Sequence, residues 1–270
     1  MDPIRTDVSD SALITAIRAN LCEFFRHLSR SFHEEHFEND RFTRWHTPLP
    51  HPWFNGVLSS RPSSQLDQAF IEETTQYFRT KHVGMFTWWM EPPLARSDWE
   101  PLLSQYGFGF SDDTPGMAAD LRALNESAQK VNRLEVRVVA DDVSLRAWAH
   151  IFIIGYGLPS DWEPVVYQLA LRLGLGFPIR NYLGYWNGEP VATSCLFFSA
   201  GVAGIYSVST LPEARGKGIG TAITLQPLLK AREMGYRICI LQSSEMGYNV
   251  YKRLGFRHLC QIEHFQRTLQ

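Results

Sequence analysis

The sequence is poor in cysteine and has no apolar run long enough to cross a membrane. Its four cysteines, Cys22, Cys195, Cys239 and Cys260, are scattered and lack the spacing of redox or zinc motifs. We interpret them as buried thiols of a reducing compartment, and we predict no metal site. Residues 1–5 contain no apolar segment of the signal-peptide type, so we expect a cytoplasmic protein without a membrane partner.

An excess of charge of either sign is also missing. Lys and Arg number 26 against 28 Asp and Glu, which gives a net charge of −2. This balance provides no electrostatic basis for binding nucleic acid or acidic membranes. With 44% hydrophobic and 20% charged residues, a chain of 270 residues has the composition of one large or two small globular domains.

Two common phosphate-binding motifs are missing as well. The P-loop spacing does not occur, and the Gly-x-Gly-x-x-Gly spacing fails because Thr221 and Ile223 occupy the positions of the third glycine. The chain has instead a glycine-rich loop between a predicted strand, 202–210, and a predicted helix, 222–234. The loop consists of Arg215, Gly216, Lys217, Gly218, Ile219, Gly220 and Thr221.

Glycines at alternate positions leave main-chain N–H groups uncovered at the start of a helix, and such groups bind anions. Arg215 and Lys217 add positive charge, and Thr221 adds a hydroxyl group. The loop is therefore predicted to bind a diphosphate.

Arg215, Gly218 and Gly220 fill the pattern Arg/Gln-x-x-Gly-x-Gly/Ala, and here the sequence resembles the GCN5-related N-acetyltransferase (GNAT) superfamily. A second motif, Tyr-x-x-Leu-Gly-Phe at residues 251–256, resembles that family's C-terminal motif. The resemblance covers residues 134–266. It implies an α/β fold with a mixed, mostly antiparallel sheet flanked by helices, and acetyl-CoA as co-substrate with its diphosphate on the loop.

The resemblance also assigns roles outside the loop. Tyr251 would protonate the leaving sulfur, and Ser244 stands where the family often has an asparagine that contacts the pantetheine. Strand residues would bind the pantetheine through their main chain, and one of their N–H groups would polarise the acetyl carbonyl; these are Val208, Ser209 and Thr210. No motif identifies the general base, which could be water or one of five side chains: Tyr206, Glu163, Glu189, His46 and His51.

The order of predicted elements indicates an internal repeat, because strand, helix, strand and short helix precede Gly-Phe at both Phe108 and Phe256. The first half has residues 59–64 in place of a glycine-rich turn. We therefore predict a degenerate GNAT-like half at 1–130 without a CoA loop, a helix-prone linker at 117–133, and an acetyltransferase domain at 131–270. The remaining predicted strands lie at 42–46, 53–59, 83–90, 134–139, 181–185, 189–198, 237–242 and 256–266, and the remaining helices at 11–31, 65–79, 143–153, 162–173 and 244–254.

Two further features concern the predicted helices. Pro227 lies inside the helix that follows the loop, so we expect a kink at 223–227 or a helix whose first turns are held by the bound phosphate. Asp141 and Asp142 are interpreted as a helix cap rather than a catalytic pair.

The main hypothesis is an acetyl-CoA-dependent N-acetyltransferase whose primary amine substrate is a small molecule and attacks the thioester directly. The alternative is a non-catalytic acyl-CoA-binding or regulatory module.

Overall fold

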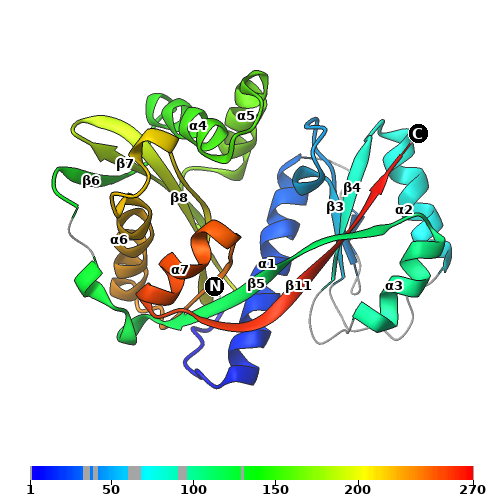
Figure 1. Ribbon diagram of the computed structural model, residues 1–270, viewed down its shortest axis with the longest axis horizontal. Coiled ribbons are helices and arrows are strands. Elements are labelled where there is room, and N and C mark those ends of the chain that lie inside the picture. The colour runs from blue at the N-terminus through cyan, green and yellow to red at the C-terminus, as the bar shows by residue number, and fades with distance from the viewer. Residues whose placement is uncertain are drawn as a thin grey trace. The chain divides into compact units, whose positions relative to one another are not determined.

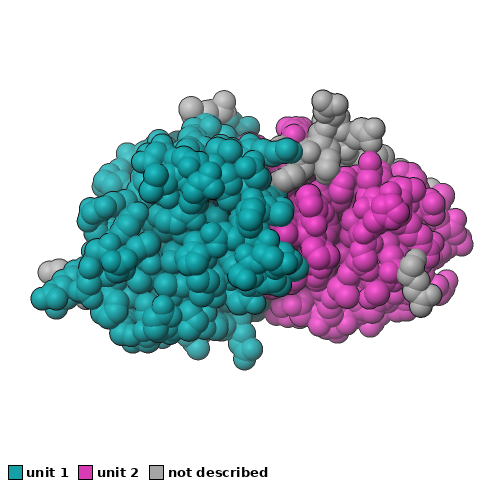
Figure 2. Space-filling view, turned by 90° about the horizontal axis from the view of Figure 1, so that it is seen from above, with its two compact units in different colours: residues 1–23, 115–259 teal, residues 24–114, 260–270 magenta. Residues whose placement is uncertain are grey.

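The computed structural model describes residues 2–32, 37–38, 42–59, 68–90, 96–128 and 131–269 (Figure 1). The chain forms two compact units (Figure 2). Unit 1 comprises residues 1–23 and 115–259, and unit 2 comprises residues 24–114 and 260–270. Each unit therefore combines segments that are far apart in the sequence. In the described ranges, no helix has the length and apolar character needed to cross a membrane.

Unit 1 contains a mixed sheet with the strand order β5, β10, β9, β8, β7, β6. The strands are β5 (Gly109–Asp120), β6 (Leu134–Val138), β7 (Ile179–Trp186), β8 (Glu189–Ser199), β9 (Val202–Thr210) and β10 (Ile238–Gln242). Strands β6 to β9 pair antiparallel in sequence order, β10 is parallel to β9, and β5 is antiparallel to β10. The mixed, mostly antiparallel sheet confirms the predicted fold class.

Helices cover both faces of this sheet (Figure 1). They are the first part of α1 (Asp10–Phe32), α4 (Asp142–Tyr156), α5 (Glu163–Leu173), α6 (Ile219–Glu233) and α7 (Glu245–Leu254). Two neighbouring residues of β8 point toward different helices. The Thr193 hydroxyl bonds to the Ser209 hydroxyl, which contacts Ile151 O of α4. The Ser194 hydroxyl donates to Ile223 O of α6. Because alternate strand residues point to opposite faces, α4 and α6 lie on opposite sides.

The N-terminus of α4 confirms the interpretation of Asp141 as a cap. The Ser144 N–H donates to Asp141 Oδ1 at 2.8 Å, and the Ser144 hydroxyl accepts the Asp141 N–H at 3.2 Å. This reciprocal pair is a capping box, which satisfies two N–H groups of the first turn. Asp142 accepts a hydrogen bond from the Tyr167 hydroxyl and forms an ion pair with Arg146.

Helix α6 is continuous from Ile219 to Glu233, although Pro227 lies inside it. Proline has no N–H, so the Ile223 carbonyl loses its helical donor. The Ser194 hydroxyl, from β8, donates to Ile223 O at 2.9 Å instead. The protein itself therefore satisfies the carbonyl that the proline leaves without a donor.

The strands of unit 2 are β1 (Phe37–Glu38), β2 (Phe42–Trp45), β3 (Gly56–Ser59), β4 (Met85–Met90) and the end of β11 (Arg257–Thr268). β3 and β4 are parallel, and the other pairs are antiparallel. One face packs on α2 (Gln68–Thr80) and α3 (Arg96–Gln105) through an aromatic core that includes Phe42, Phe78, Phe86, Trp88 and Phe265.

The repeat predicted from the order of elements is present in the structure. The series β3, α2, β4, α3, β5 corresponds to β9, α6, β10, α7, β11. Both short helices end alike: the Phe108 N–H donates to Leu103 O at 3.1 Å, and the Phe256 N–H donates to Tyr251 O at 3.0 Å. The strand that follows each short helix pairs with a strand of the other repeat. β5, from the first repeat, pairs with β10 in unit 1, and β11, from the second repeat, pairs with β4 in unit 2.

Two local predictions differ from the structure, and part of a third lies outside the described residues. The helix-prone linker is wrong at its start, because residues 117–119 are buried in β5 and sheet burial overrides the helix propensity of alanine. The strand predicted at 53–59 begins only at Gly56, since Pro52 starts a 3₁₀ turn whose Trp53 N–H donates to His51. Of the predicted helix 65–79 and the turn 59–64, residues 60–67 lie outside the described residues.

Candidate functional site

The glycine-rich loop connects β9 to α6 and has a left-handed backbone at two positions. The φ angles are +75° at Gly216 and +81° at Gly218, a region that costs other residues about 1–2 kcal/mol. A Cβ at Gly216 would meet no atom within 4 Å, whereas a Cβ at Gly218 would lie 3.3 Å from Val131 Cγ2. Conformation is therefore the reason for glycine at position 216, and limited space adds to it at position 218.

The main-chain N–H groups of residues 216–221 are not used within the described part of the chain. Before them, the Arg215 N–H donates to Pro212 O at 3.3 Å, and after them the Ala222 N–H donates to Gly218 O at 3.1 Å. The start of a helix carries partial positive charge. Six successive N–H groups at this position can therefore bind an anion with several oxygens.

The two cationic side chains of the loop contact the protein itself. Arg215 Nε donates to Thr210 O at 3.0 Å and its Nη2 donates to Gly155 O at 2.8 Å. Lys217 Nζ donates to Glu213 O at 2.5 Å. These contacts fix the loop against the end of β9 and the end of α4, and the predicted contact of either cation with phosphate remains a prediction.

Strand β9 separates from β10 halfway along its length. In the described residues, the two strands pair only where Ala203 and Gly204 face Cys239 and Ile240, although β9 continues to Thr210. The pairing with β8 is interrupted by an irregularity at the same level, where Ser207 has a φ of +53°. A bulge of this kind bends the strand.

Beyond this point, Ser209 and Thr210 pair with β8 alone. The Ser209 hydroxyl, buried against Thr193 at 2.8 Å, has a packing role. The side of β9 that faces away from β8 near Val208 is thus left to other partners. This arrangement is compatible with the predicted main-chain role of residues 208–210.

Tyr251 is the buried tyrosine of α7, with 8% of its surface exposed. Burial raises the pKa of its phenol above the usual range, and the nearby groups Tyr156 and Cys239 raise it further. No hydrogen-bond partner takes its hydroxyl in the described part of the chain. Tyr251 is therefore a protonated donor at neutral pH.

The structure places the phenol of Tyr156 and the thiol of Cys239 near Tyr251, and the sequence analysis did not predict either neighbour. Burial raises the pKa of Tyr156, and it raises the pKa of Cys195 to about 12. The Tyr206 hydroxyl donates to Asn20 Oδ1 at 2.9 Å. The signal for Tyr156 in the sequence is its position between Gly155 and Gly157, directly after the helix predicted at 143–153. These neutral groups form an uncharged environment in which electrostatic interactions are strong.

Four of the other predicted residues have structural partners: Ser244, Glu163, His46 and His51. The Ser244 hydroxyl caps α7 by accepting the Gly247 N–H at 3.2 Å. Glu163 pairs with His150 at 2.8 Å, and Glu189 is exposed at the start of β8. Among the candidate bases in unit 2, His46 Nδ1 lies 2.6 Å from the Tyr77 hydroxyl, and His51 accepts the Trp53 N–H.

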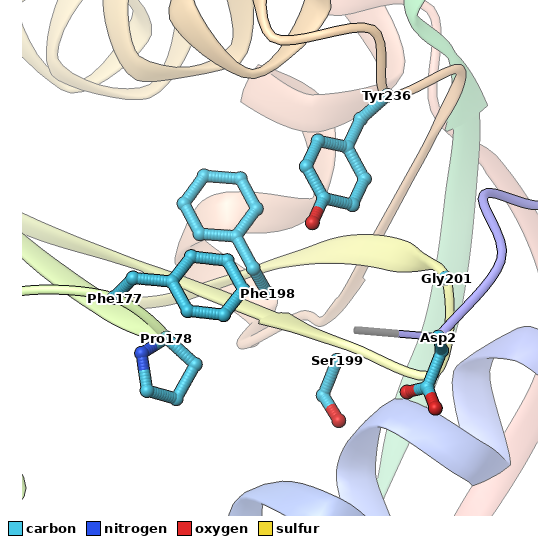
Figure 3. Close-up of a pocket in the computed structure, with 7 residues that line it drawn as sticks. All are labelled: Asp2, Phe177, Pro178, Phe198, Ser199, Gly201 and Tyr236. Carbon is cyan, nitrogen blue, oxygen red and sulfur yellow. The ribbon is translucent and has the colours of Figure 1, made fainter.

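Unit 1 also has a cavity of about 280 Å³ at the opposite end of β9 from the loop (Figure 3). A strand of nine residues separates the two places, or about 25 Å. The Asp2 carboxylate at this cavity accepts the Ala200 N–H at 2.8 Å. The lining residues are Asp2, Phe177, Pro178, Phe198, Ser199, Gly201 and Tyr236. This cavity is distinct from the loop.

Comparison with known proteins agrees with this geometry. Residues 145–256 match the model of the acetyltransferase (GNAT) family. An uncharacterized N-acetyltransferase of Escherichia coli K12, YjgM, is 25% identical over 108 residues, which are 39% of this chain and 65% of that protein. The match thus spans slightly less than two thirds of the curated relative.

Solved structures share the fold over most of the chain. A GCN5-related N-acetyltransferase from Kribbella flavida has a TM-score of 0.70 at 18% identity, covering 94% of this chain and 96% of its own. A tandem GNAT protein from the clavulanic acid biosynthesis pathway has a TM-score of 0.57 at 13% identity, covering 79% and 75%.

The match to the acetyltransferase (GNAT) family model spans residues 145–256, and this range includes the glycine-rich loop, the separated part of β9 and Tyr251.

Proposed function

We propose that unit 1 binds acetyl-CoA and transfers its acetyl group to a primary amine of a small molecule. The observation that carries the proposal is the run of six unused N–H groups at residues 216–221, at the start of α6. A diphosphate offers several oxygens to such a run, and the positive end of the helix favours its charge.

The main chain of Val208, Ser209 and Thr210 would bind the pantetheine arm, because β9 has separated from β10 there. One N–H group of this segment would donate to the acetyl oxygen as negative charge develops on it. The thioester would then lie between the two strands, within reach of an amine from the other side.

Tyr251 would donate a proton or a hydrogen bond to the departing thiolate. Its raised pKa keeps the phenol protonated at neutral pH. A thiolate that forms in the same buried surroundings would be more basic than a thiolate in water. The amine loses its proton on becoming an amide, and water or Tyr206 remains the proposed acceptor of that proton. Tyr206 fits this role less well than water, because burial holds the pKa of its phenol well above the usual range.

Unit 2 would not catalyse the same reaction. The repeat places Leu103, which is fully buried, at the position of Tyr251, and leucine has no proton to give. This observation supports a degenerate first half, and the name of the solved structure from the clavulanic acid pathway, a tandem GNAT protein, is in keeping with a tandem arrangement. A small neutral or cationic amine also suits a protein with a net charge of only −2.

Isothermal titration with acetyl-CoA tests the binding step. Gly220→Glu places a carboxylate in the loop without a left-handed φ, and its Cβ would meet only Thr210 Oγ1, at 3.8 Å. This variant should lose the binding heat. Gly176→Glu, at another open position, is the matched control and should bind normally. Equal binding by both variants would exclude the loop as the site.

Steady-state kinetics with a panel of primary amines tests the transfer step. Tyr251→Phe should lower kcat by about a hundredfold with an unchanged acetyl-CoA affinity. Tyr248→Phe, on the same helix, should have little effect. Acetyl-CoA binding without transfer to any amine would support the non-catalytic alternative.

A further inference from the structure

Gln242 is the last residue of β10 and lies where β9 and β10 have separated. Ile240 is the last residue of β10 in register with β9, opposite Gly204. Two residues further along each strand come Gln242 and Tyr206. Because alternate residues share a face, Gln242 is on the same face as Tyr206, at the same level of the two diverging strands.

Residues of this face are held by α1. A Cβ at Gly204 would lie 2.1 Å from Asn20 Oδ1 and 2.6 Å from the Tyr206 ring, so glycine is required for both to pack there. Asn20 Nδ2 donates to Ser199 O at 3.1 Å, and its Oδ1 accepts from Tyr206. The Tyr206 phenol is thereby fixed in place beside the strand separation.

The side chain of Gln242 has no such partner. Its Nε2 atom is buried and donates to no acceptor in the described part of the chain, while its main chain pairs with Gly116 of β5. Buried polar atoms are almost always hydrogen-bonded, because an unmet donor destabilises the fold. An unmet donor at the opening between two strands therefore indicates a ligand atom.

Gln242 lies on the face of the sheet opposite α6, the helix whose N-terminus has the proposed diphosphate site. Phe197 pairs with Gly204, and Gly204 pairs with Ile240, so Gln242 shares the face of Phe197. Ser194, an even-numbered residue of β8, points to the other face and bonds to Ile223 of α6. The ligand atom is therefore assigned to the acceptor rather than to the cofactor. The side chains placed on the α1 face here, those of Asn20, Tyr206 and Gln242, are all uncharged.

We infer that Gln242 is a specificity-determining residue, which donates a hydrogen bond from Nε2 to a neutral oxygen of the acceptor amine. The substrate class is an amino alcohol or an amino amide, since a carboxylate or phosphate would lack a countercharge among these side chains. This inference rests on the proposed function of the same site.

Thermal unfolding without ligands gives the first test. Gln242→Met keeps the length of the side chain and removes the unmet donor. The variant should unfold at an unchanged or higher temperature, by up to about 3 °C, because no protein hydrogen bond is lost. Gln168→Met, on the exposed surface of α5, is the control. A fall of several degrees specific to Gln242→Met would show a structural role and overturn the inference.

Kinetics with matched amines give the second test. The pairs are ethanolamine with propylamine, and 2-amino-1-phenylethanol with 2-phenylethylamine. Gln242→Met should lower kcat/KM about tenfold more for the hydroxylated member of a pair. Equal losses within both pairs would overturn the inference. Failure of the wild type to acetylate any of the four amines, with acetyl-CoA binding intact, would instead count against the proposed transfer reaction, while the unfolding measurement still judges the role of Gln242.

Discussion

The hydrogen bond from Ser194 to Ile223 O of α6 leads to a quantitative prediction of unfolding free energies. The Ser194 hydroxyl donates to Ile223 O at 2.9 Å, and all three residues are buried. Ser194→Ala leaves that carbonyl without a donor, which should cost about 1–3 kcal/mol of unfolding free energy. In a Pro227→Ala background the alanine N–H can donate to Ile223 O, so the same serine substitution should cost less than about 1 kcal/mol.

A double-mutant cycle measures this difference. Urea unfolding of the wild type, both single variants and the double variant should give a coupling of about 1–2 kcal/mol, with similar m-values in all four proteins. Each kcal/mol corresponds to about 2–4 °C in Tm for a protein of this size. Equal effects of Ser194→Ala in both backgrounds would refute the explanation of how α6 tolerates its proline.

Three further predictions concern the site and its support. Gly216→Asn should bind acetyl-CoA nearly as well as the wild type, whereas Gly216→Val should raise Kd about tenfold, because asparagine tolerates the left-handed φ and a β-branched residue does not; identical titrations would contradict this. Gly204→Ala should cost about 1–3 kcal/mol through overlap with Asn20, and calorimetry showing no loss would argue against that packing. Because burial raises the pKa of Cys195 to about 12, the unfolded chain loses this proton first, so stability should fall as pH rises above about 9 by up to about 1.4 kcal/mol per pH unit. Urea unfolding between pH 8 and 10 should show a smaller slope for Cys195→Ala, and an unchanged slope would contradict the assignment.

The sequence was sufficient to predict features that depend on neighbouring residues. The glycine loop, the helix after it and the Asp141 cap all follow from local backbone preferences. The meander of β7, β8 and β9 follows from alternation and short turns. For these elements, tertiary structure agrees with local preference.

Features that depend on distant partners could not be predicted. The pairing of β5 with β10 and of β11 with β4 joins segments more than a hundred residues apart, and no local pattern in either strand names its partner. The donor that satisfies Ile223 comes from β8, and the phenol of Tyr156 reaches the site only because α4 packs on the sheet. Gln242 belongs to no sequence motif. It became a candidate because its buried Nε2 atom has no acceptor in the described part of the chain, which only the folded structure shows.

The central claim is that the main-chain N–H groups of residues 216–221 hold the diphosphate of acetyl-CoA. It is tested most directly by titrating ¹⁵N-labelled protein with acetyl-CoA and following the amide resonances of this loop. The account predicts that these six resonances shift together and saturate at the affinity measured by calorimetry. Binding heat with those resonances unmoved would contradict it.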